Sequence, residues 1–142
     1  MRVSQILRTK GDVVFTAIPH DTVDAICALL HARRVGAMVI MDGDRLAGIV
    51  SERDIVRALA TEGAAALSRP ISAVMTTEVY LADPDDDVDA LLEIMTDRRI
   101  RHLPVCHLGK LLGIVSIGDL VKSKMTEVEA EADGLKAYIA AG

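Results

Sequence analysis

The sequence predicts an α+β fold built from two copies of one β-α-β-β-α unit, packed through their sheets. The main observation is an internal repeat. When the chain is shifted by 65 positions against itself, 16 of the 46 residue pairs between Val14–Leu59 and Val79–Lys124 are identical. Each copy also shows helical apolar spacing followed by a polar hairpin turn. One copy is too small to bury the apolar faces of its own elements, so the two must pack together.

Each copy opens with a short strand, a turn at a proline and an amphipathic helix. We expect strands over Val13–Ala17 and Val79–Leu81, with turns at Pro19 and Pro84. A helix follows because apolar residues recur with i, i+3, i+4, i+7 spacing. The stripes are Val23, Ile26, Cys27 and Leu30 in the first copy and Val88, Leu91, Leu92 and Met95 in the second; the N-cap candidates are Asp21, Thr22, Asp86 and Asp87.

A two-stranded hairpin and a second helix complete each copy. The second helices should begin at Ser51 and Ser116. The expected strands are Ala37–Met41, Leu46–Val50, Leu103–Cys106 and Leu111–Val115. The repeats predict one domain over 1–66, a second over 67–125, and an acidic, helical tail over 126–142 with a helix break at Gly134.

Composition excludes several function classes. The chain has 142 residues and a net charge of −5, which argues against binding a nucleic-acid polymer, and its few aromatics leave no stacking platform for single strands. Cys27 and Cys106 are interpreted as buried free thiols of a reducing compartment. No signal peptide or apolar run long enough to cross a membrane is evident, so we expect a cytoplasmic protein.

The best-matched block of the two copies has the spacing G-h-h-S-x-x-D, where h is apolar, at a strand end that enters a helix. It covers Gly48–Asp54 and Gly113–Asp119. One interpretation is a helix cap, with the Ser at the N-cap and the Asp at N3. The other is a ligand site, because an Asp in the first helical turn can accept two hydrogen bonds from a ribose diol. The duplication favours the second interpretation.

These motifs make the chain resemble a tandem pair of cystathionine-β-synthase (CBS) domains, or Bateman module. The resemblance rests on Ile-Val-Ser-Glu-Arg-Asp-Ile-Val-Arg, Arg-His-Leu-Pro-Val and Gly-Ile-Val-Ser-Ile-Gly-Asp-Leu-Val-Lys, and covers about residues 1–125. It implies a homodimeric regulatory protein, not an enzyme, that senses AMP, ADP or ATP, or sometimes NAD(H) or S-adenosylmethionine, and signals to a partner protein. A scaffold or interaction module with degenerate nucleotide sites is the alternative.

The resemblance also implies two pseudo-symmetric nucleotide sites, in which the Asp holds the ribose, the Ser lies near the sugar or phosphate and an Ile lies under the adenine. One site would use Ser116, Asp119 and Ile114 with Lys10, Gly11, Asp12 and Val14; the other would use Ser51, Asp54 and Ile49 with Thr77, Val79 and Leu81. Arg101 and His102 match the family position that reaches phosphate, where the first copy has Gly36 and Ala37. The first copy offers only Arg53, so we favour the Ser116/Asp119 site.

Metal binding and catalysis have weaker support. The acidic run Asp83–Asp89 lacks the spacing of a calcium loop and is better explained as the start of a helix. Cys106 and His107 have no second ligand pair at usable spacing. No catalytic triad order, phosphate-loop lysine or nucleophile elbow occurs, so we expect neither a metal nor a catalytic residue.

Overall fold

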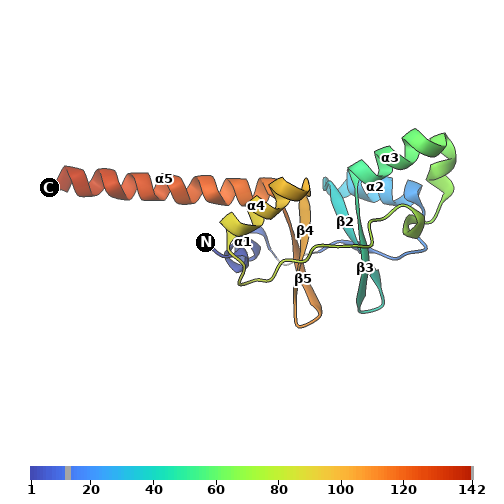
Figure 1. The fold of residues 1–142 in the computed structure, drawn as a ribbon, viewed down its shortest axis with the longest axis horizontal. Helices are drawn as coiled ribbons and strands as arrows, with labels where there is room; N and C mark the ends of the chain where they lie inside the picture. Colours follow the sequence, from blue (N-terminus) through green and yellow to red (C-terminus); the bar gives the residue numbers. More distant parts are fainter. Residues whose placement is uncertain (12–13, 142) are drawn as a thin grey trace. The chain divides into compact units, whose positions relative to one another are not determined.

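A computed structural model describes residues 1–11 and 14–141, which form two compact units. One, here the α5 unit, comprises Met1–Asp12, Leu81–His107 and Leu112–Gly142. The other, here the α3 unit, comprises Val13–Tyr80 and Leu108–Leu111. Both contain helices and strands, which confirms the predicted α+β class (Figure 1).

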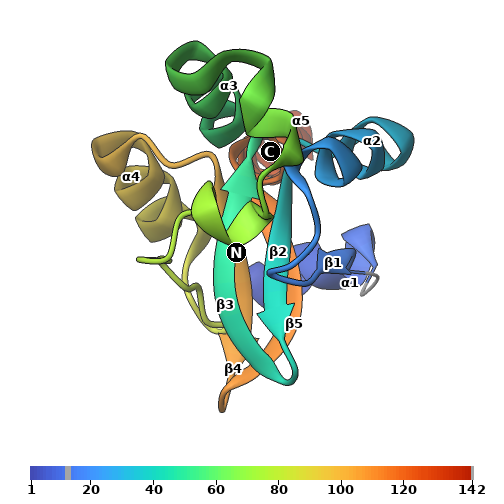
Figure 2. The same ribbon diagram turned by 90° about the vertical axis from the view of Figure 1, so that its right-hand side faces the viewer.

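The α3 unit holds a three-stranded sheet in the order β1-β2-β3. Strand β1 (Thr16–Ala17) is parallel to β2 (Ala37–Asp42), and β2 forms an antiparallel hairpin with β3 (Arg45–Ser51), which lies beside it in Figure 2. Helices α2 (Val23–Arg33) and α3 (Glu52–Glu62) and the 3₁₀ turns η1 (Gly63–Ser68) and η2 (Ile71–Ala73) complete the unit.

The α5 unit holds the equivalent hairpin of β4 (His102–His107) and β5 (Lys110–Ser116). Its helices are α1 (Val3–Lys10), α4 (Val88–Arg98) and α5 (Ile117–Ala141). Helices α1 and α4 contact the start of α5, and the rest of α5 continues beyond them (Figure 1). Both predicted second helices begin where the sequence places them, directly after Ser51 and Ser116.

The residues that precede the opening strand of each repeat pack into the core formed by the other repeat's elements. Val3 and Ile6 of α1 are buried with Leu91, Val115 and other apolar residues of the second repeat. In the α3 unit, Ile71 is buried among the apolar residues of the first repeat. Division by packing is therefore different from division by sequence repeat, since each unit is completed by a short segment from the other repeat.

The opening strand of the second repeat differs from the prediction. Residues Val79–Leu81 form no strand; a single parallel bridge joins Ala82 to Val105. The first repeat does form a strand, Thr16–Ala17, while Val13 of the predicted strand lies outside the described residues. Pro104 explains the difference, because it stands where the first repeat has Val39 and has no N–H to extend the ladder.

The predicted helix break at Gly134 is also wrong. Helix α5 runs without interruption from Ile117 to Ala141. A glycine in a helix interior costs only about 1 kcal/mol relative to alanine. The strong helix formers around it, among them Ala132, Leu135 and Lys136, outweigh that cost.

The two cysteines are free thiols, as predicted, but half-buried instead of fully buried. Burial raises the pKa of both thiols, and the charge of Asp24 raises that of Cys27 further. Both are therefore weak nucleophiles at neutral pH. Across residues 1–11 and 14–141, no helix is long and apolar enough to cross a membrane.

Candidate functional site

Both copies of the G-h-h-S-x-x-D motif form a reciprocal helix cap. The Ser51 N–H donates to Asp54 Oδ2 at 3.0 Å, and the Asp54 N–H donates to Ser51 Oγ at 3.3 Å. The same two bonds measure 2.9 and 3.1 Å between Ser116 and Asp119. The capping interpretation is therefore confirmed. It fixes each carboxylate at the positive end of a helix, which also suits a ligand site.

The glycine of each motif allows another part of the chain to approach the strand. A Cβ on Gly48 would lie 2.7 Å from the Thr76 carbonyl oxygen, and one on Gly113 would lie 2.7 Å from Leu7 Cδ2. Thr76 also exchanges two backbone hydrogen bonds with Ile49, of 2.8 and 3.0 Å. The chain next to each motif Asp thus comes from the segment that opens the other repeat.

Asp54 is buried and its carboxylate is heavily used. Its exposed fraction is 7%. Oδ2 accepts from Ser51, whose Oγ lies 3.2 Å away, and Oδ1 accepts from Thr76 Oγ1 at 3.2 Å. Arg57 Nη1 lies 3.5 Å from the same Oδ1. Both oxygens are therefore engaged by the protein itself.

Asp119 lies in a more open and more charged setting. Its side chain is 29% exposed, and Lys10 Nζ donates to Oδ2 at 2.6 Å and to the Ile114 carbonyl at 2.9 Å. Partial burial raises the pKa of the Asp119 carboxyl, but the hydrogen bonds from Lys10 and Ser116 and the Lys10 charge lower it by more, so the pKa lies below its ordinary value of 3.8. Lys10, predicted as a residue of the Ser116/Asp119 site, is thus an ion-pair partner of the motif Asp.

An equivalent backbone contact is made at the start of both helices, but the residue that provides the carbonyl differs. The Ile117 N–H at the start of α5 donates to the Arg101 carbonyl at 2.8 Å, and the Glu52 N–H donates to the Gly36 carbonyl at 3.0 Å. This bond holds the backbone of Arg101 next to the Ser116 cap, and the Arg101 side chain is exposed. The equivalent residue of the other unit is Gly36, which has no side chain. His102 follows as the first residue of β4 and is half-buried.

The other predicted site residues are distributed over both units. Ile49 and Ile114 sit on β3 and β5 directly before the caps, Arg53 lies exposed on the first turn of α3, and Gly11 follows α1. Thr77 and Val79 follow Thr76 within the α3 unit. Val14 belongs to the α3 unit and Leu81 to the α5 unit, and Asp12 lies outside the described residues.

Sequence reasoning missed Thr76 and Arg57. Thr76 precedes the region in which the repeats align without a gap, so no match between copies marked it. Arg57 follows the motif, where a basic residue on a helix normally indicates only a solvated face. In the described ranges, no group of three or more His, Cys, Asp or Glu side chains is placed to hold a metal.

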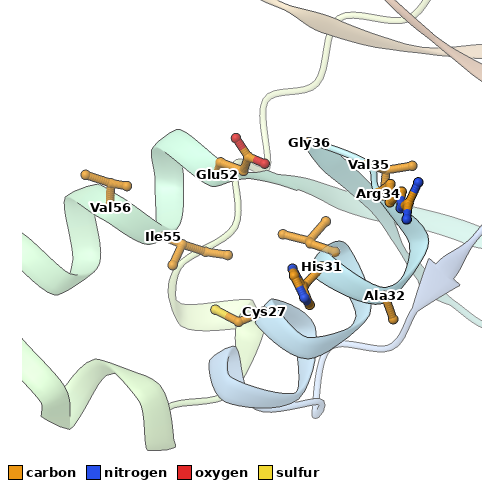
Figure 3. A pocket seen from close by; sticks show the side chains of 10 residues that line it. Cys27, His31, Ala32, Arg34, Val35, Gly36, Glu52, Ile55 and Val56 are labelled. Atoms are coloured by element: carbon orange, nitrogen blue, oxygen red, sulfur yellow. The ribbon is translucent and has the colours of Figure 1, made fainter.

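A groove in the α3 unit is separate from the motif carboxylate. It has a volume of about 750 Å³ and lies between α2 and α3, with Cys27, His31, Ile55 and Val56 among its lining residues (Figure 3). Glu52 reaches its rim, but neither Ser51 nor Asp54 lines it. The sequence did not predict this groove.

The family model of the CBS domain matches residues 3–61 and 71–125. The chain belongs to the CBS-domain family. Its structure is similar to that of the CBS-domain protein ATU1752 from Agrobacterium tumefaciens, with 41% identity, a TM-score of 0.85, and coverage of 87% of this chain and 99% of that one.

Two related CBS structures were solved with adenosine compounds. The CBS-domain protein PAE2072 from Pyrobaculum aerophilum, complexed with AMP, is 28% identical with a TM-score of 0.73, and the match covers 84% of this chain and 89% of that one. The CBS domain pair of protein MJ0100, in complex with 5-methylthioadenosine and S-adenosyl-L-methionine, is 25% identical with a TM-score of 0.79. The match covers 89% of this chain and 98% of that one.

Proposed function

We propose that this CBS pair is a regulatory module that binds an adenosine nucleotide such as AMP, ADP, ATP or NAD(H) at the Ser116/Asp119 centre. The observation that supports this most directly is the Asp119 carboxylate, which is partly exposed and held at the start of α5 by Ser116 and Lys10. The related CBS structures with AMP and with S-adenosyl-L-methionine support an adenosine ligand.

The chemistry of a nucleotide matches the groups present. A carboxylate can accept about four hydrogen bonds, and Ser116 and Lys10 both use Oδ2, so Oδ1 is suited to accept from a ribose hydroxyl. Lys10 and Arg101 supply positive charge for phosphate. Ile114 offers an aliphatic surface for adenine, as a chain with so few aromatic residues requires.

The Ser51/Asp54 centre is proposed as the weaker of two sites. Both oxygens of Asp54 already bond to the protein, and Gly36 replaces the arginine found at position 101. A nucleotide there would have to displace Thr76 or Arg57. This centre therefore suits the alternative function, in which a degenerate site serves only as scaffold.

Calorimetry tests the assignment with AMP, ADP, ATP, NAD(H) and S-adenosylmethionine on the wild type, Asp119→Ala and Asp54→Ala. A ligand the size of AMP should bind with a dissociation constant on the order of 10 μM. We expect Asp119→Ala to weaken binding at least about tenfold, which matches the loss of a hydrogen-bonded charge. Failure of the wild type to bind any of the five contradicts the proposed function, and equal binding by wild type and Asp119→Ala contradicts the choice of site.

We propose that ligand binding is communicated as a population shift to a regulated partner protein, since nothing in the site calls for turnover. Such a module would work as a homodimer. Val56 on α3 and Ile94 on α4 are 63% and 39% exposed, which fits helical faces that meet a second copy. Light scattering at about 50 μM protein should give the mass of a dimer, because this concentration is well above the dissociation constant of a stable dimer. A monomer mass would contradict the proposal.

A further inference from the structure

The C-terminal part of α5 has an apolar stripe that no described part of the chain covers. Val121, Met125, Val128, Leu135 and Ile139 are 43–67% exposed. Together with the exposed Ala132 they follow one another at alternating steps of four and three residues, which is the a/d repeat of a coiled coil. Leu120, outside this stripe, is buried in the core of the α5 unit, and Ile117 at the start of the helix packs against that core.

The helix itself needs a partner to be stable. Glu127 and Glu131, and likewise Glu129 and Asp133, are like-charged neighbours one helical turn apart, which destabilises an isolated helix. In proteins, most of the stability of a helix comes from packing its apolar face against a partner. Gly134 lies on the face away from the stripe, so it does not interrupt the seam.

The charges beside the stripe select the partner. With Met125 at position a, the flanking e and g positions hold Lys122, Lys124, Glu129, Glu131, Lys136 and Tyr138. In a parallel, in-register pair each g residue faces the e residue five positions later on the other helix. This matches Lys124 with Glu129 and Glu131 with Lys136, two opposite-charge pairs. Lys124 also bonds to Asp89 within the chain at 3.0 Å, so Glu131–Lys136 is the more informative pair.

An antiparallel pair would be repulsive. Aligning the same apolar residues in the antiparallel sense places Glu131 against Glu131, Glu129 against Glu129 and Lys122 against Lys136 of the second helix. We propose that α5 pairs in parallel and in register with α5 of a second copy of this chain, along Val121–Ile139. This surface is distinct from the nucleotide sites, so the proposal does not depend on nucleotide binding.

Disulfide trapping in the whole chain tests both contact and direction. Cys27 and Cys106 are changed to serine, and Leu135→Cys, on the seam, is compared with Asp133→Cys, on the outer face. We expect mild oxidation to link Leu135→Cys into dimers at least about tenfold faster than Asp133→Cys, because residues on the seam of a parallel pair face their own copies. Equal rates would overturn the proposal. So would linkage that occurs only in a Met125→Cys/Leu135→Cys double variant, the antiparallel result.

Charge reversal provides a second test that leaves the native cysteines in place. Glu131→Lys turns two attractive pairs per dimer into two repulsive ones and should weaken association roughly threefold to tenfold. Lys136→Glu should act similarly, and the double variant should recover wild-type association. Asp133→Lys is the matched control with the same charge change. Sedimentation measures the association of each variant. The proposal is overturned if Asp133→Lys weakens association as much as Glu131→Lys does, or if the double variant does not regain wild-type association.

Discussion

The Asp54 and Asp119 centres share a backbone design but differ in what surrounds the carboxylate. Each Asp caps its helix through a serine, with nearly equal distances. Asp54 is buried against the Thr76 hydroxyl and also contacts the exposed Arg57 guanidinium, whereas Asp119 is paired with the Lys10 ammonium and stays partly exposed. Duplication therefore preserved the geometry of the cap and changed the chemistry beside it.

Under the proposed function, this difference corresponds to a structural role for Asp54 and a binding role for Asp119. A carboxylate whose two oxygens are satisfied within the protein contributes most to stability, because its hydrogen bonds are shielded from water. A carboxylate bound on one oxygen by a partly exposed lysine can exchange that partner for a ligand. The comparison predicts that substitutions in the α3 unit affect folding more, and those in the α5 unit affect binding more.

The largest difference should come from the two motif glycines. Gly48→Ala places a Cβ against the Thr76 backbone carbonyl, which is itself fixed by the bridge to Ile49, and should destabilise the chain by about 2 kcal/mol through overpacking. Gly113→Ala meets only the end of the Leu7 side chain, which can rotate away, so we expect less than about 1 kcal/mol. Urea unfolding of both variants measures this difference. Equal losses of unfolding free energy would show that the chain packed against Gly113 is as rigid as the chain packed against Gly48.

Removal of the carboxylates should give the next largest effect. Asp54→Ala deletes a buried cap and leaves the Thr76 hydroxyl without its acceptor, for a loss of about 1.5 kcal/mol of unfolding free energy. Asp119→Ala deletes a partly exposed cap and should cost about 1 kcal/mol. Nucleotide affinity should show the opposite order. An Asp119→Ala chain that loses more stability than Asp54→Ala would contradict this division of roles.

Acid should weaken the stabilising contribution of Asp119. Because folding lowers the pKa of Asp119 below 3.8, its charged form stabilises the folded chain in full above that value. The stabilisation is lost as the pH falls below 3.8 and through the lower pKa of the folded state. We therefore expect the stability difference between wild type and Asp119→Asn to be constant above about pH 5 and to shrink below 3.8. Urea unfolding at several pH values tests this. A stability difference that grows on acidification would contradict the prediction, because it would mean that folding raises the pKa of Asp119.

The sequence predicted the elements better than their partners. Apolar spacing and the Ser-x-x-Asp cap identify helices correctly because they depend on neighbouring residues, as at Ser51 and Ser116. The apolar spacing did not predict that Val3 and Ile71 enter the core of the other repeat, because an apolar residue is equally suited to the core of either repeat. The bond from Lys10 to Asp119 joins positions far apart in the chain, and a flexible lysine shows no spacing that would identify its partner. Assignment of ligand-binding roles to these residues stays a prediction.

The smallest effect should be the coupling between each carboxylate and its distant partner, measured by double-mutant cycles. Lys10→Met with Asp119→Asn should give a coupling of about 0.5 kcal/mol, because the pair is partly exposed to water. Thr76→Val with Asp54→Asn should give about 1 kcal/mol, since that hydrogen bond lies against a buried carboxylate. Salt distinguishes the two. Screening should reduce the Lys10–Asp119 coupling as ionic strength rises and leave the Thr76–Asp54 coupling unchanged, because only the former joins two charges. If both couplings respond equally to salt, the electrostatic difference between the two centres is not their defining feature.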